Sequence, residues 1–241
     1  MNYLGDYSGI PLHNTSLLEG IRNKVGTSVE VLYAKGVNLS MNGDTISQNN
    51  YQYIDKISLP NPADNQKLIN EAVQIAQQSD IIIAAIGENE QFSRESWLAD
   101  HFGDMADLNL QSQQEELVKA LAATGKPVIV YLVHGRPLSI NWINAHIPAI
   151  VDGWFMGEQA GHAAANILFG ETCPSGKLTI TYPRAAGQVP MYYNHKPGAQ
   201  FFEYVTEKNT PLYAFGHGLS YTTFQYSTPR LSEAAIKRMA L

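Results

Sequence analysis

The clearest indication of the fold is the stretch Asp80-Ile81-Ile82-Ile83-Ala84-Ala85-Ile86-Gly87. Its apolar run does not alternate with polar residues, and it ends at a glycine. That pattern is typical of a strand buried on both faces of a parallel sheet. Residues 66–78, just before it, carry apolar side chains every three or four positions, which predicts a helix.

The same rhythm continues outward along the chain. Further elements are predicted at 29–33 (strand), 112–123 (helix), 127–133 (strand), 149–155 (strand), 158–169 (helix) and 178–181 (strand). Ser112-Gln113-Gln114-Glu115 has the pattern of a helix capping box. Strands alternating with helices at this spacing predict an α/β fold, with a parallel sheet and right-handed crossovers.

Composition narrows the function classes. The 241 residues suit one large domain or two small ones. A net charge of −6 argues against a nucleic-acid or anionic-membrane partner, and no apolar run approaches the roughly 20 residues that span a bilayer. The single cysteine and the scattered histidines predict no internal disulfide, no metal site and no cofactor. The first nine residues lack the pattern of a signal peptide, and localisation stays open.

A long acidic loop follows the first buried strand. Residues 88–104 hold five carboxylates in 17 positions, interleaved with Arg94, His101 and aromatic residues. Ligands of open parallel sheets collect beyond the carboxyl ends of the strands, where this loop lies. A carboxyl group beside Trp or Phe can have a raised pKa and act as a general acid, and a neighbouring Arg can hold a second carboxylate or a substrate hydroxyl. The alternative is a salt-bridged surface loop.

A second loop, His134-Gly135-Arg136-Pro137, follows the 127–133 strand. His134 is interpreted either as a base or as a turn residue whose ring bonds to backbone groups. Arg136 is expected to tie this turn to a neighbouring loop.

Several blocks together resemble a known family. They are Leu4-Gly5-Asp6-Tyr7-Ser8-Gly9, Val31-Leu32-Tyr33-Ala34-Lys35-Gly36, Gly87-Glu88, Ser93-Arg94-Glu95, Gly125-Lys126-Pro127, Gly135-Arg136-Pro137-Leu138, Pro174-Ser175-Gly176-Lys177-Leu178, Tyr182-Pro183-Arg184, Gln188-Val189-Pro190-Met191-Tyr192-Tyr193 and the run from Pro211 to Phe224. In this order they resemble the C-terminal α/β-sandwich domain of family 3 glycoside hydrolases, the β-glucosidase group.

The resemblance implies a three-layer sandwich. Its central sheet would be mostly parallel, with about six strands, one of them antiparallel, and helices on both faces. Residues 1–226 would form this domain, and residues 227–241 a truncated linker towards a fibronectin-III-like domain.

The resemblance also implies a division of labour. Relatives join this domain to an N-terminal (β/α)8 barrel, which carries the nucleophile Asp and most sugar contacts. Ser93-Arg94-Glu95 matches the acid/base segment of the family, so Glu95 is the predicted general acid/base, with Glu88 and Glu90 as alternatives. Tyr7, Arg94 and Trp97 are predicted to bind substrate, a β-glucoside or short β-linked oligosaccharide.

Two departures from the family accompany these expectations. Gly103-Asp104-Met105 stands where many relatives have Gly-Asp-Arg, and the residues before Leu4 are too few for a barrel, so we expect a fragment that is inactive alone. A stand-alone sugar-binding module using Tyr7, Phe92 and Trp97 is one alternative. The other is an interaction domain that forms homodimers through its barrel-facing surface, which light scattering over a concentration series would test.

Overall fold

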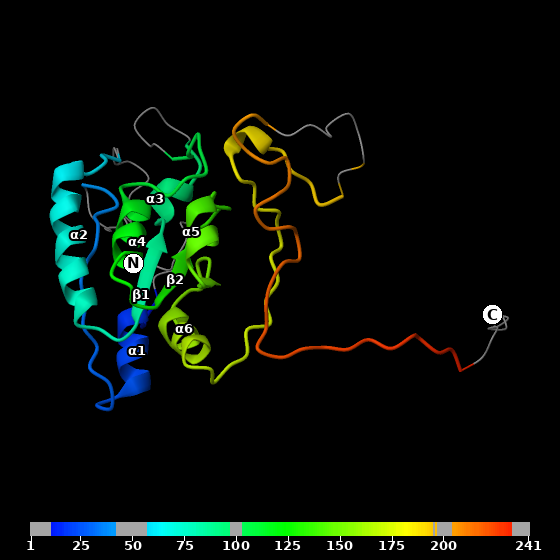
Figure 1. The fold of residues 1–241 in the computed structure, drawn as a ribbon, viewed down its shortest axis with the longest axis horizontal. Coiled ribbons are helices and arrows are strands. Elements are labelled where there is room, and N and C mark those ends of the chain that lie inside the picture. The colour runs from blue at the N-terminus through cyan, green and yellow to red at the C-terminus, as the bar shows by residue number, and fades with distance from the viewer. Residues whose placement is uncertain (1–10, 42–56, 97–102, 195, 197–203, 233–241) are drawn as a thin grey trace.

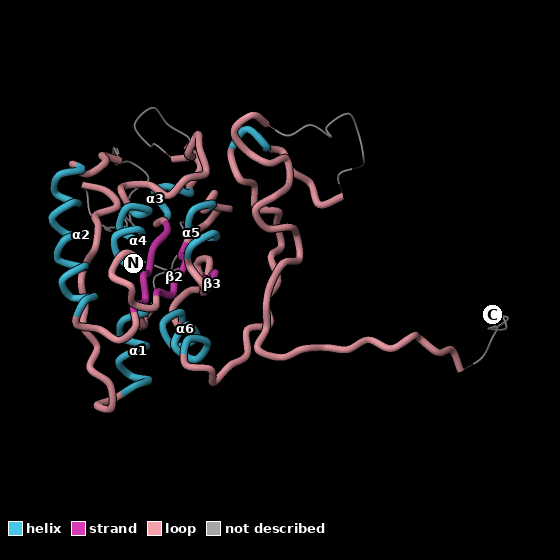
Figure 2. Tube along the Cα trace, in the orientation of Figure 1, coloured by secondary structure: helices cyan, strands magenta, loops and turns pink. Residues whose placement is uncertain are grey.

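The computed structural model describes residues 11–41, 57–96, 103–194, 196 and 204–232. The helices are α1 (Leu17–Val25), α2 (Pro62–Gln77), α3 (Glu90–Ser93), α4 (Gln114–Ala122), α5 (Asn141–His146) and α6 (Ala160–Leu168). The strands are β1 (Ile82–Gly87), β2 (Val128–Val133) and β3 (Ala149–Asp152). A 3-10 turn, η1, spans Ala186–Gln188. Figure 1 shows the helices gathered around the sheet, and Figure 2 shows that loops dominate the chain after α6.

The three strands pair in the order β1-β2-β3, and both pairings are parallel. Gly87 is in register with Val133, and Leu132 with Asp152, so the carboxyl ends of the strands share one edge. The parallel α/β class predicted from the sequence is confirmed. The described residues contain three strands, and the six-stranded, three-layer arrangement stays a prediction.

Side chains leave β2 alternately towards two hydrophobic clusters, because successive residues of a strand point to opposite faces. Val128, Val130 and Leu132 join the cluster that includes α2 and α4, where Ile69 and Val118 are buried. The second cluster combines Tyr131 and Val133 of β2 with Leu17 and Ile21 of α1 and Ala160 and Ala164 of α6. Helices therefore pack against the sheet through both sets of strand side chains.

Two predicted elements differ from the structure. Residues 29–33 form no strand, and Val29 and Tyr33 are exposed. A strand needs a neighbouring ladder of hydrogen bonds as well as β-branched side chains, and β1 pairs only with β2 within the described ranges. The predicted strand at 178–181 is replaced by a single antiparallel bridge between Tyr182 and Tyr213.

The predicted capping box is wrong. Ser112 and Gln113 both have positive φ, and the helix begins one residue later, at Gln114. The Ser112 hydroxyl donates to the Leu39 carbonyl at 2.7 Å, and Glu115 pairs with Lys119 one turn along the helix. The turn before α4 is therefore fixed by a contact to a distant segment rather than by local capping.

The chain after α6 docks on α5 through polar contacts. Tyr182 exchanges backbone hydrogen bonds with Leu212 and Tyr213, and the Asn141 amide donates to the Arg184 carbonyl at 2.9 Å. The Tyr213 hydroxyl donates to Asn144 at 2.6 Å.

Residues 221–232 are exposed throughout, and Figure 1 shows this red segment extending away from the rest of the molecule. No helix in the described ranges is long and apolar enough to cross a membrane.

Candidate active site at the carboxyl edge of the sheet

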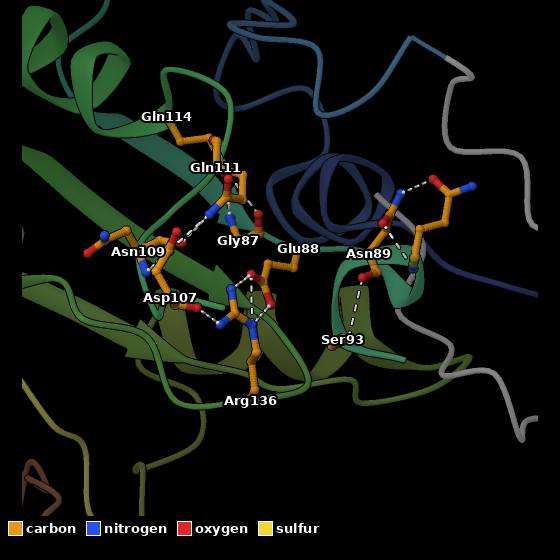
Figure 3. A network of polar contacts seen from close by, with 10 residues as sticks. Gly87, Glu88, Asn89, Ser93, Asp107, Asn109, Gln111, Gln114 and Arg136 are labelled. Carbon is orange, nitrogen blue, oxygen red and sulfur yellow. Dashed lines mark hydrogen bonds and ion pairs between the residues drawn. The ribbon is translucent and has the colours of Figure 1, made fainter. Parts of the chain in front are cut away.

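Gly87 ends β1 at this edge, and one side chain binds both its backbone N–H and its carbonyl oxygen. The Gln114 amide accepts from Gly87 N at 2.7 Å and donates to the Gly87 carbonyl at 2.8 Å (Figure 3). Gln114 itself is 1% exposed. Because buried backbone groups need partners, this amide lets β1 stop here without leaving an unpaired peptide group. The start of the acidic loop is thereby fixed against α4.

Glu88, the next residue, is held by Arg136 from the turn after β2. Arg136 Nε lies 3.1 and 3.0 Å from the two Glu88 oxygens, and a terminal nitrogen of the same guanidinium also binds the carboxylate. Another guanidinium nitrogen donates to the Asp107 carbonyl (Figure 3). Burial raises the pKa of the Glu88 carboxyl, and the Arg136 guanidinium opposes that rise. Arg136 therefore ties its turn to the start of the acidic loop and to the chain just beyond its end, which confirms the predicted tie to a neighbouring loop.

The loop continues through a short helix, α3, and the charged side chains of Glu90, at its start, and Arg94, just after its end, are both buried. The Asn89 side chain accepts from Gln91 N at 3.2 Å at the start of α3. Arg94 Nη1 lies 3.8 Å from Glu90 Oε2, and both side chains are only 4% exposed. Phe92 is 1% exposed, so its ring is not available to bind sugar in the way that the alternative of a sugar-binding module predicts.

Glu95 follows Arg94 and is exposed, unlike the two alternative carboxylates. The residues on either side of it are bound by the returning end of the loop. Asp104 N donates to the Arg94 carbonyl at 2.7 Å, and Ser96 N donates to Asp104 Oδ2 at 3.1 Å. Glu95 therefore lies between two residues whose backbone groups are both hydrogen-bonded to Asp104.

His134, at the end of β2, lies in a separate polar cluster. Its Nε2 is 2.8 Å from Asp152 Oδ1, and the Tyr182 hydroxyl donates to Asp152 Oδ2 at 2.7 Å. An ionised carboxylate can only accept, so His134 Nε2 carries the proton and donates it. The ring is fully buried, with its centroid 4.7 Å from that of Trp154. The expectation that backbone groups bind the His134 ring is wrong, because its hydrogen-bond partners in the described part of the chain are the Asp152 and Tyr182 side chains.

Burial, together with the nearby Asp152 carboxylate, raises the pKa of the Tyr182 phenol, which therefore keeps its proton and donates. Tyr182→Phe is expected to lower the free energy of unfolding by about 1–2 kcal/mol, because it removes a hydrogen bond to a charged group. Urea unfolding measures this loss. Tyr193→Phe, at an exposed tyrosine, is the control and should change stability little. Equal stabilities of the two variants would contradict the importance of the contact between Tyr182 and Asp152.

The structure describes only part of the predicted site. Arg94 and Glu95 are described, whereas Tyr7 and Trp97 lie outside the described residues. Sequence reasoning missed Asp152, although a carboxylate that ends an apolar strand is a signal for the strand-edge cluster. Within the described residues, no group of three or more His, Cys, Asp or Glu side chains is placed to hold a metal ion.

The chain is similar to enzymes that cleave glycosidic bonds. Residues 1–221 match the model described as the glycosyl hydrolase family 3 C-terminal domain. The chain therefore belongs to glycosyl hydrolase family 3 and corresponds to its C-terminal domain.

Individual relatives agree with that assignment. A Beta-xylosidase of Formosa agariphila is 41% identical over 97% of this chain, and a Periplasmic beta-glucosidase of Salmonella typhimurium is 38% identical over 98%. The structure of the b-glucosidase EmGH1 from Erythrobacter marinus covers 98% of this chain with 43% identity and a TM-score of 0.86. This chain spans 29%, 31% and 31% of the lengths of these three proteins, respectively.

Proposed function

We propose that this chain supplies the general acid/base of a retaining β-glycosidase, and that Glu95 is that residue. Exposure is the observation that carries the choice among the three candidates. Glu88 is 1% exposed and is bound to Arg136, and Glu90 is 4% exposed beside Arg94. Glu95 is exposed at the same edge of the sheet. A general acid must come within hydrogen-bond distance of the leaving oxygen, which an exposed carboxyl can do.

The chemistry needs a second carboxylate. In a retaining glycosidase the acid/base and the nucleophile lie about 5 Å apart on opposite sides of the scissile bond. Glu95 protonates the glycosidic oxygen as the nucleophile attacks the sugar, and then removes a proton from the water that releases the sugar. We assign the nucleophile to an Asp of a (β/α)8 barrel partner, and the substrate to a terminal β-linked glucoside or xyloside. On this assignment the chain is inactive alone.

Exposed apolar side chains support contact with a partner. They include Val189, Tyr192, Tyr193, Leu219, Phe224 and Tyr226, all in the part of the chain that follows α6. Exposed apolar side chains that gather in one patch mark interaction surfaces, and we propose that those of this part of the chain do so. We assign this surface to the barrel partner, while the homodimer stays a prediction.

Hydrolysis of 4-nitrophenyl β-glucoside and 4-nitrophenyl β-xyloside tests the proposal. The chain is assayed alone and after mixing with a separately made family 3 barrel domain. Activity is expected only in the mixture, and Glu95→Gln should lower it about 100-fold, which is within the usual contribution of general acid–base catalysis. Glu116→Gln, at an exposed carboxylate on α4, is the matched control and should leave the rate unchanged. An unchanged rate with Glu95→Gln would refute the assignment.

A further inference from the structure

Asp104 binds the peptide groups on both sides of Glu95. Its backbone N–H donates to the Arg94 carbonyl at 2.7 Å, and its carboxylate accepts from Ser96 N at 3.1 Å. The two contacts therefore fix the backbone just before and just after Glu95.

The backbone around Asp104 suits this close approach. A Cβ on Gly103 would overlap the Arg94 carbonyl oxygen, far inside the 3.0 Å that real Cβ atoms keep, so only glycine lets the chain pass so near. Asp104 has a φ of 51°, in the left-handed region that Asp and Asn tolerate better than most residues. Position 103 thus carries the residue type that the geometry requires, and position 104 carries one that tolerates its positive φ well.

Residues on either side of these contacts are themselves held in place by the rest of the protein. Behind Glu95, the Arg94 side chain is buried beside Glu90. Beyond Asp104, the Asp107 carbonyl accepts from Arg136, and the Leu108 carbonyl accepts from Ser139 N at 2.7 Å. The chain is therefore anchored on both sides, and Asp104 joins the two anchored stretches at the point where Glu95 projects.

We propose that Asp104 is the positioning residue for Glu95, and that its two hydrogen bonds set the place from which the Glu95 carboxyl reaches the leaving oxygen. This inference rests on the proposed function of Glu95. Asp104 itself is exposed, so losing its contacts should change the orientation of Glu95 more than the stability of the domain. Asp104→Asn keeps an oxygen acceptor and the tolerance for positive φ, whereas Asp104→Ala removes the acceptor.

The first measurement uses this chain by itself. Amide hydrogen exchange at Ser96 is compared among the unmodified chain, Asp104→Ala and Asp104→Asn. Asp104→Ala should speed exchange at Ser96 about 10-fold, because exchange follows local opening, and Asp104→Asn should not. Unchanged exchange at Ser96 in Asp104→Ala would show that the contact does not hold the backbone in place, and would overturn the proposal.

The second measurement uses the mixture with the barrel domain and two leaving groups. Phenyl β-glucoside needs protonation of its leaving oxygen, whereas 2,4-dinitrophenyl β-glucoside releases a stable phenolate without it. For Asp104→Ala we expect kcat/KM to fall about 10-fold or more with the phenyl substrate and less than about threefold with the dinitrophenyl substrate, because only the first depends on a placed acid. Asp104→Asn should stay within about threefold of the unmodified chain on both substrates.

Each departure from this pattern has a defined meaning. Equal losses on both substrates would show that Asp104 supports the fold rather than Glu95, and an Asp104→Asn loss as large as that of Asp104→Ala would show that its hydrogen bond is not the cause. Either result overturns the proposal. Glu95→Gln is assayed in parallel. If it leaves the phenyl substrate unaffected, the function of Glu95 itself is refuted, which is distinguishable from a failure at Asp104 alone.

Discussion

Arg136→Met is expected to lower the free energy of unfolding by about 3–5 kcal/mol, the usual loss when one partner of a buried ion pair is removed. Glu88 is 1% exposed, and Arg136 is the cation that binds both of its oxygens. The same change also frees the Asp107 carbonyl, so the chain loses one attachment at the start of the acidic loop and one just beyond its end. Urea unfolding of the two proteins at neutral pH measures the difference.

The loss should depend on pH with a definite sign. Burial raises the pKa of Glu88, and Arg136 lowers it, so removing Arg136 raises the pKa further. A carboxyl whose folded pKa is raised contributes stability that is fully present below its unfolded pKa, near 4.3, and is lost as the pH rises through the folded value. The deficit of Arg136→Met should therefore be smaller at about pH 4 than at about pH 7. An equal deficit at both would contradict the ion pair as its cause.

Two further variants serve as controls for the ion pair. Glu88→Gln combined with Arg136→Met removes both charges, and should recover part of the stability that Arg136→Met loses. Lys67→Met breaks an exposed ion pair with Asp64, at 2.9 Å, and should leave stability nearly unchanged because water screens that pair.

Gly87→Ala is the second change with a large expected effect. A Cβ on Gly87 would overlap the Val133 carbonyl oxygen and lie within 3.0 Å of other backbone atoms of β2, and Gly87 has a φ of 134°. Neither the backbone of β2 nor this φ can adjust without breaking the pairing of β1 with β2. We expect a loss of more than about 4 kcal/mol, which is exceptional for one substitution and comparable to the whole stability of many domains. Far-UV circular dichroism and urea unfolding measure it.

Gly125→Ala separates the two causes. Gly125 also has a positive φ, of 75°, but no atom lies within 4 Å of its added Cβ. It should cost about 1–2 kcal/mol, the penalty for a side chain in the left-handed region. If Gly87→Ala costs no more than Gly125→Ala, the close approach of β1 to β2 is not what requires glycine at position 87.

The strands were predictable where the sequence has a continuous apolar run. The runs at 80–86 and 127–133 indicated β1 and β2 because buried parallel strands leave few polar positions. α1 escaped prediction because its apolar stripe is short, and because it packs on α6 through Gly20 and Gly161, which carry no hydrophobic signal. The wrong capping box at Ser112 shows that a local motif can be overridden by a contact to Leu39, far away in the sequence.

The charged residues of the site were predictable, but the contacts that hold their backbone in place were not. The acidic loop and Arg136 were identifiable because charged residues directly follow buried strands. Asp104 was noted only as a part of Gly103-Asp104-Met105, because nothing in the sequence indicates that residue 104 lies beside residues 94–96. Met105 stands where the resemblance to the family predicts Arg, and the described contacts of the loop include those of Asp104 and Arg136.

The placement of the acidic loop inside the crossover from β1 to β2 bears on how freely this segment can change over evolution. The entropic cost of closing a flexible connection grows only with the logarithm of its length, so doubling it costs about 0.6 kcal/mol. Arg136 and Asp104 meet the chain on either side of the stretch beyond Glu95. Changes in the length of the crossover that spare these contacts would therefore leave the sheet register intact. Such changes in length are a route by which descendants of this sequence could vary the loop at little cost in stability.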